Sequence, residues 1–135
     1  MRVEWLILAD AAQVNGGKLY LLGGGWDQLN VGSAFPVTQR MGLAASFLVP
    51  WNETNQKRNV ELSLVTDDGD ELLKINGQIE VGRPAGIPAG SGQRAQLAAD
   101  MSVEFKRPGV YSIIARIDGE ESARIAFRVM ERAQG

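Results

Sequence analysis

The chain has 135 residues, a formal net charge of −2, 44% hydrophobic residues and 22% charged residues, which is typical of one folded domain over residues 1–135 and excludes a disordered chain. It contains no histidine and no cysteine, which excludes disulfides, thiolate-ligated metals and nucleophilic sites that use a histidine base. Its basic residues are scattered, so no nucleic-acid partner is predicted.

Runs of strand length alternate with turn signals such as Asn-Gly-Gly, Asp-Asp-Gly, Pro-Gly and Asp-Gly along the whole chain. The runs predict an all-β fold of about eight antiparallel strands in two sheets. The expected spans are 3–12, 18–28, 39–49, 58–67, 71–81, 94–105, 110–118 and 121–130.

The first predicted strand includes an apolar stretch over residues 5–9. The stretch is too short for the core of a signal peptide and far too short to span a bilayer. We therefore expect a strand there, a cytoplasmic protein and no membrane partner.

The first three predicted strands carry apolar residues on both faces, whereas a strand with one wet face alternates. One set of apolar residues falls on the register that we assign opposite to the core: Leu6, Leu8, Tyr20, Leu22 and Leu48. Something must cover so large an apolar patch. The two candidates are a second subunit, which would make a homo-oligomer, and the loop 82–93 of the same chain.

The middle of the chain contains one segment that favours a helix, residues 52–58, in which Asn52 is a good N-cap and the basic residues come late. It predicts at most one short helix. Residues 82–93 contain four glycines and two prolines, and they are expected to form the longest irregular connection.

The last third of the chain alternates cleanly with period two. Tyr111 and Phe127 fall on the apolar register of two consecutive strands, joined by a tight turn at Asp118 and Gly119. Both aromatic residues are therefore predicted to lie in the core.

Several segments resemble a family of uncharacterised bacterial all-β proteins: 8–12, 17–27, 49–52, 82–84 and 108–111. The resemblance covers nearly the whole chain and implies a compact all-β fold without an assigned activity. The stretch from Phe105 to Val129, with its Phe-x-x-Pro-Gly-x-Tyr sequence, is also similar to the final strands of immunoglobulin-like sandwiches. Such sandwiches serve many functions, so the similarity concerns fold alone.

Candidate ligand-binding residues are few. Trp26 and Trp51 lie beside polar residues near strand ends, where an indole ring either stacks on a sugar or peptide or closes the end of the core. Asp27, Asn52 and Arg83 would supply hydrogen bonds and charge to such a ligand.

Carboxylates offer two alternatives. Asp10 and Asp27 would suit acid/base chemistry in a carbohydrate hydrolase if both faced one cleft. The acidic segment 67–71 would suit a weak calcium site, but its Asp-Gly composition is also that of a hairpin turn. We expect the turn, no bound metal, no cofactor and no catalytic residues.

The sequence thus leaves the function unknown and favours a non-catalytic binding or protein-interaction domain, by exclusion of catalytic chemistry. The alternatives are a carboxylate-dependent hydrolase that acts on a carbohydrate and a structural subunit of a larger bacterial assembly.

Overall fold

The computed structural model describes residues 1–32 and 34–131, and these residues form an all-β structure. The strands are β1 (Arg2–Asn15), β2 (Lys18–Gly24), β3 (Gln28–Val31), β4 (Val37–Val49), β5 (Arg58–Thr66), β6 (Glu71–Ile79), β7 (Gln93–Phe105), β8 (Gly109–Ile117) and β9 (Glu120–Glu131). A single turn of 3-10 helix, η1 (Trp51–Glu53), follows β4.

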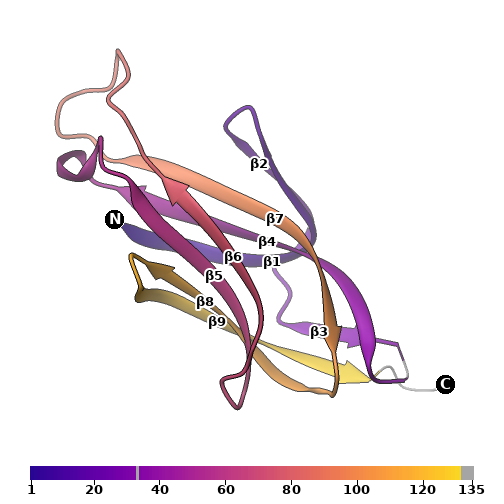
Figure 1. The fold of residues 1–135 in the computed structure, drawn as a ribbon. Coiled ribbons are helices and arrows are strands. Elements are labelled where there is room, and N and C mark those ends of the chain that lie inside the picture. Colours follow the sequence, from indigo (N-terminus) through magenta and orange to yellow (C-terminus); the bar gives the residue numbers. More distant parts are fainter. Residues whose placement is uncertain (33, 132–135) are drawn as a thin grey trace.

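The strands form two sheets that pack against each other (Figure 1). One sheet has the order β2-β1-β4-β7 and is antiparallel throughout. The other has the order β3-β9-β8-β5-β6, and its edge strand β3 runs parallel to β9. No helix in the part of the chain that the structure describes is long and apolar enough to cross a membrane.

The core lies between the sheets and draws alternate residues from each of them. The largest fully buried side chains are Phe47, Phe105, Met41, Leu43, Leu64 and Ile113. Tyr111 and Phe127 are buried as predicted, with 4% and 2% of their surface exposed. The register of the β8–β9 hairpin, with Tyr111 opposite Phe127, is therefore confirmed.

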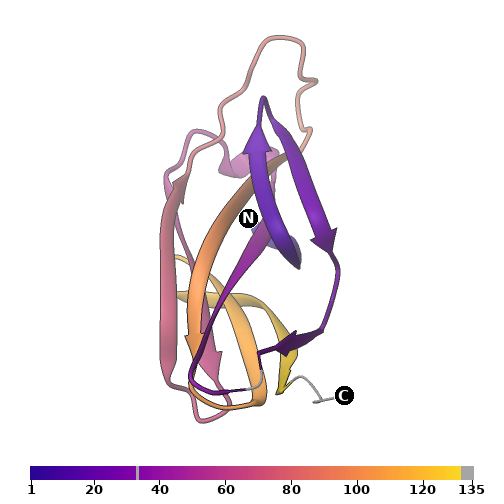
Figure 2. The same cartoon turned by 90° about the vertical axis from the view of Figure 1, so that its right-hand side faces the viewer.

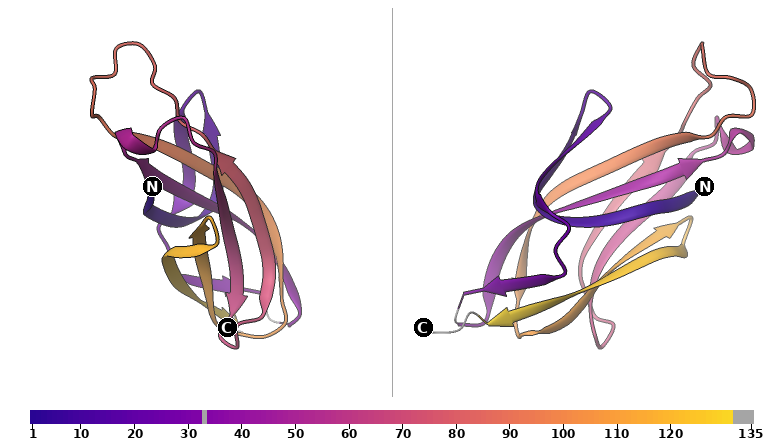
Figure 3. Two further views of the ribbon diagram at one scale, coloured as in Figure 1. Left: turned by 60° about the vertical axis from the view of Figure 1, so that its left-hand side comes forward. Right: turned by 180° about the vertical axis from the view of Figure 1, so that it is seen from behind.

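Strand β1 changes partner half-way along its length. Its first half pairs with β4 as far as Ala9 and Gly42, and its second half pairs with β2. Beyond Ala9, β1 crosses over β4 and reaches β7, where the Ala12 amide donates a hydrogen bond of 2.9 Å to Asp100 Oδ1. We call the resulting hairpin, residues 10–24, the arm. Its tip stands out from the body of the molecule (Figure 3) and lies on the opposite side from β6 (Figure 2).

Three details of the predicted fold need correction. The described residues form nine strands, because the predicted strand 18–28 ends at Gly24 and β3 begins at Gln28. The second sheet is mixed, because β3 joins β9 in parallel. The segment predicted to be helical forms only the 3-10 turn η1. Pro50 occupies the N-cap position of this turn, so Asn52 lies inside the turn and does not cap it.

The predicted facing of the first strand is also wrong. A register irregularity between Val3 and Trp5 shifts the alternation, so that Val3, Leu6 and Leu8 all face the core. Leu6 and Leu8 are buried there and take no part in an exposed patch. Tyr20 and Leu22 are exposed, as the patch required, and Leu48 is half-buried on the outer face of its sheet.

The loop 80–92 does not cover that patch either. It lies against η1, where the Asn55 amide donates to the Val81 carbonyl at 2.7 Å. It is the longest connection between described strands, as predicted, and it projects beyond the end of the sheets (Figure 1).

Candidate functional site

The five predicted ligand-binding residues fall into two separate groups. Trp51 and Asn52 belong to η1, and Arg83 lies in the loop against it. Trp26 and Asp27 precede β3, which lies at the other end of the molecule from η1 (Figures 1 and 3). One binding site cannot contain all five residues.

Arg83 and Trp51 form a compact contact. The Arg83 guanidinium carbon lies 4.0 Å from the Trp51 ring centroid, a cation–π contact. The same guanidinium donates to Thr54 Oγ1 at 2.7 Å and to the Trp51 carbonyl at 3.0 Å. One face of the indole ring is therefore occupied by this chain's own arginine and is closed to a stacking ligand.

Trp26 packs on the end of the core. Its ring meets that of Phe127 edge to face, with centroids 6.0 Å apart. Its indole nitrogen is buried and finds no hydrogen-bond acceptor among the described residues. Asp27 is exposed, and its carbonyl accepts a hydrogen bond from the Arg128 amide at 2.9 Å.

The candidate carboxylates Asp10 and Asp27 are both exposed to solvent. Asp67 and Asp68 lie in the predicted turn after β5 and pair with Arg107 at 3.3 and 2.6 Å. Within the described residues, no three Asp or Glu side chains gather as they would around a metal ion.

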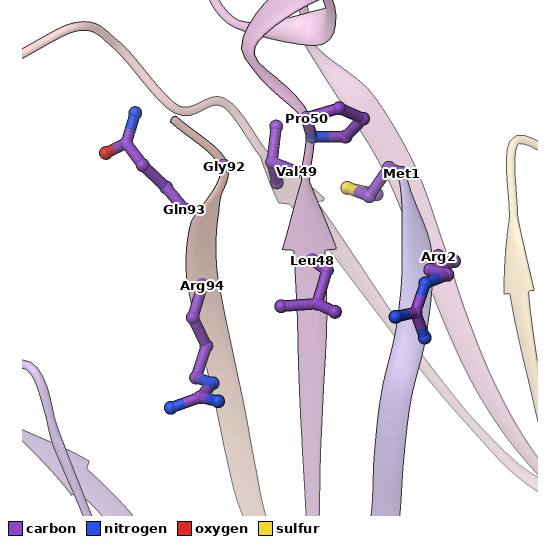
Figure 4. Close-up of a pocket in the computed structure, with 8 residues that line it drawn as sticks. All are labelled: Met1, Arg2, Leu48, Val49, Pro50, Gly92, Gln93 and Arg94. Atoms are coloured by element: carbon purple, nitrogen blue, oxygen red, sulfur yellow. The ribbon is translucent and has the colours of Figure 1, made fainter. Parts of the chain in front are cut away.

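A hollow of about 670 Å³ opens at the end of the first sheet, where β1 and β7 begin and β4 ends (Figure 4). Apolar groups of Met1, Leu48, Val49 and Pro50 line it together with Gly92, Gln93 and two arginines, Arg2 and Arg94. Its volume lies within the range of small-molecule sites. The sequence did not indicate this hollow.

The strand register explains the composition of the hollow. Arg2 on β1 and Arg94 on β7 both lie opposite Leu48 on β4, so the three side chains form one row across the sheet. Figure 4 shows Leu48 between the two arginines. This row joins residues 2, 48 and 94 and becomes visible only when the pairing of three strands is known.

Glu4 fixes the orientation of Arg94. Arg94 donates two hydrogen bonds to the Glu4 carboxylate, at 2.6 and 2.7 Å, and Ser46 donates a third at 3.1 Å. The hydrogen bond from Arg94 lowers the pKa of Glu4 most; Ser46 and the charge of Arg2 contribute to the same direction. The pKa of Arg94 is raised by the same pair.

We expect Arg94→Gln to raise the pKa of Glu4 toward its ordinary value, because the substitution removes the main hydrogen bond to the ionised form. In the unmodified chain, a lowered folded-state pKa contributes stability above the unfolded pKa, and this contribution is lost as pH falls through the folded value. The variant should therefore show a weaker loss of stability on acidification. Carboxyl NMR titration measures the shift, and an unchanged Glu4 pKa would contradict the pairing.

The arm carries the most exposed apolar side chains of the described residues. Leu22 exposes 71% of its surface and Tyr20 exposes 56%. Both belong to β2, the outermost strand of its sheet. From Leu19 to Trp26 no residue is charged. The arm thus presents an uncharged, exposed edge of the first sheet.

Comparison with known families gives one match. The model of a family of unknown function, DUF6941, matches residues 4–130. The chain belongs to this family. The match includes all strands of both sheets except their outermost residues, so the two-sheet domain and the DUF6941 region are the same part of the chain. No curated protein matches the chain. The family description assigns no function.

Proposed function

We propose that this DUF6941 protein is a non-catalytic interaction domain that pairs with a second copy of itself through the free edge of β2. The observation that carries the proposal is the uncharged stretch of this edge strand from Leu19 to Gly24, with exposed Tyr20 and Leu22. An edge strand presents unpaired amides and carbonyls, and a partner strand satisfies them.

The other edge strands are less suited to pairing. Strand β7 carries Arg94, Asp100 and Glu104 along its length, and β6 carries Glu71 and Lys74. Charges of this kind prevent edge-to-edge association. Strand β3 has only four residues. Strand β2 has seven, and its only charge is Lys18 at the turn.

The geometry of β2 is self-complementary. Asn15 and Lys18 flank a two-residue turn in which Gly16 and Gly17 both have positive φ, so they form the first hydrogen-bonded pair of the hairpin. The alternation of antiparallel pairs then directs the backbone groups of Leu19 and Leu21 to the free edge. Gly23 has a positive φ, so the regular alternation ends before it.

A twofold axis at Leu21 would place two β2 strands antiparallel with the amide and carbonyl groups of the two Leu21 residues paired. It would also place Tyr20 of each copy directly opposite Leu22 of the other. An aromatic–aliphatic pair of this kind contributes roughly 0.2–1 kcal/mol in a sheet, and the symmetric interface contains two of them. A second copy therefore fits this edge without any like-charge contact.

We expect the unmodified protein to be a dimer and Leu22→Lys to be a monomer, because the substitution places a charge opposite Tyr20 of the partner copy. Leu22 is exposed, so the variant should keep the melting temperature of the monomer fold. Sedimentation velocity measures the oligomeric state, and thermal melting followed by circular dichroism measures the fold.

Leu72→Lys is the matched control, because Leu72 is an exposed leucine on β6, with 37% of its surface exposed. It should leave the dimer intact. A monomeric wild-type protein across the accessible concentration range, or a Leu22→Lys variant that stays dimeric, would overturn the proposal.

We add two further proposals, one on the kinship of the fold and one on the location of the protein. The Tyr111 hydroxyl donates to the Arg107 carbonyl at 2.6 Å, four residues upstream, which resembles the tyrosine corner of immunoglobulin-like sandwiches and supports that kinship. The absence of cysteine suits a reducing compartment, and we place the domain in a bacterial cytoplasm.

A further inference from the structure

We propose that the hollow at the end of the first sheet binds a small amphipathic carboxylate, a linear molecule with one carboxylate head and an aliphatic body. The hollow shares no residue with the free edge of β2. The inference therefore goes beyond the proposed dimer, and each can fail without the other.

The aliphatic body of the ligand would lie over Leu48. Eight residues line a space of about 670 Å³, and among the apolar ones Leu48 and Pro50 have side chains that are open to a ligand. The side chains of Val49 and Met1 are buried against the core, so they hold this end of the sheet in position beneath the hollow. A short aliphatic chain fits such a space and buries apolar area there.

The carboxylate head of the ligand would lie beside Arg2. Arg94 is held by Glu4 through two hydrogen bonds, and this pair is neutral. Arg2 is exposed and forms no ion pair with any of the described residues. The row Arg2, Leu48, Arg94 with Glu4 thus carries one net positive charge beside the apolar walls.

An arginine fork matches the geometry of a carboxylate, to which it donates two parallel hydrogen bonds. A ligand with a carboxylate on Arg2 and an aliphatic chain over Leu48 would satisfy the charge and the apolar walls together. A simple inorganic anion would leave the apolar groups wet, and an uncharged alkane would form no ion pair with Arg2, which would then donate only to water. The combination therefore selects an amphipathic monoanion.

Gly92 offers a direct way to close the hollow. A Cβ atom at this position would lie 3.5 Å from the Val49 carbonyl oxygen, an ordinary contact, and the glycine has no positive φ. The backbone therefore accepts a Cβ atom at this position, and we expect Gly92→Val to add its side chain to the lining of the hollow.

The test titrates octanoate, acetate and 1-octanol into the isotopically labelled protein and follows backbone amide shifts. We expect octanoate to bind with a dissociation constant on the order of 0.1–1 mM, as its few heavy atoms allow, and to perturb the amides of Val49 and Gln93. Acetate should bind at least about tenfold more weakly, because it lacks the aliphatic body.

Two variants separate the parts of the site. Arg2→Gln should weaken octanoate by about tenfold, the value of a lost charge-assisted hydrogen bond, and leave octanol unchanged. Gly92→Val should weaken both. Arg107→Gln, at the distant Asp67–Asp68 turn, is the control that removes an arginine elsewhere and should change neither.

Octanoate that binds Gly92→Val as tightly as the wild type would show that it binds elsewhere and would overturn the proposal. So would equal affinity for acetate and octanoate, or the absence of octanoate binding. Leu22→Lys should bind octanoate normally, which distinguishes failure of this site from failure of the β2 dimer.

Discussion

Phe127→Ala is expected to destabilise the protein by about 3–5 kcal/mol, because it removes a buried aromatic ring and leaves a cavity that the surrounding strands fill only in part. Phe127 exposes 2% of its surface. Its ring meets those of Tyr111 and Phe105 with centroids 5.9 and 6.2 Å apart, and it supports Trp26 at the end of the core. Urea unfolding with tryptophan fluorescence measures the loss.

Two further variants make this test specific. Phe127→Leu keeps most of the volume and should cost less than about 1.5 kcal/mol. Arg128→Ala changes the adjacent, exposed side chain of β9 and should stay within about 0.5 kcal/mol of the wild type. A loss below about 1 kcal/mol for Phe127→Ala would contradict its place in the core.

The C-terminal strands were predictable because only one assignment of their buried face fits the alternation of their residues. Each strand of the β8–β9 hairpin has one face that is wholly apolar over its middle and an opposite face that includes polar residues, so the register that buries Tyr111 also buries Phe127. The turn at Asp118 and Gly119, where both residues have positive φ, joins the strands as the sequence indicated.

The N-terminal strands were less predictable because both of their faces are apolar. A strand of this kind gives no period-two signal, and the irregularity between Val3 and Trp5 then decides which residues face the core. The assignment of Leu6 and Leu8 to the outer face failed for this reason. Strand β3 was missed because it has four residues and pairs with the far end of the chain.

The candidate sites show the same limit. The sequence selected Trp26, Asp27, Trp51, Asn52 and Arg83 as one set. The fold brings Trp51 and Arg83 into contact and places Trp26 and Asp27 at the other end of the molecule. The row of Arg2, Leu48 and Arg94 escaped prediction because it depends on the register of three strands. A register between distant strands leaves no local pattern in the sequence.

Gly42 is where the crossing of β1 over β4 is expected to be most sensitive to substitution. A Cβ atom at residue 42 would lie 2.7 Å from the Ala12 nitrogen and 2.8 Å from the Ala11 carbonyl carbon, closer than such atoms approach in proteins. Both neighbours are backbone atoms, so no side chain can rotate away. No local sequence pattern marks this glycine, whose role is to allow the close approach of another strand.

We expect Gly42→Ala to destabilise the protein by about 1–3 kcal/mol, because the arm must lift away from β4 and the hydrogen bond from Ala12 to Asp100 must lengthen or break. Gly77→Ala is the matched control: it is also a strand glycine without positive φ, and its Cβ would lie 3.4 Å from Val60 Cγ2, a contact that side chains accommodate. Its effect should be small, since alanine also restricts the unfolded chain.

Hydrogen exchange of the Ala12 amide reports the crossing directly: it should become faster in Gly42→Ala and stay slow in Gly77→Ala. Equal stability and equal protection of Ala12 in both variants would show that the arm does not rest on β4, and the position of the free β2 edge would then have to be revised.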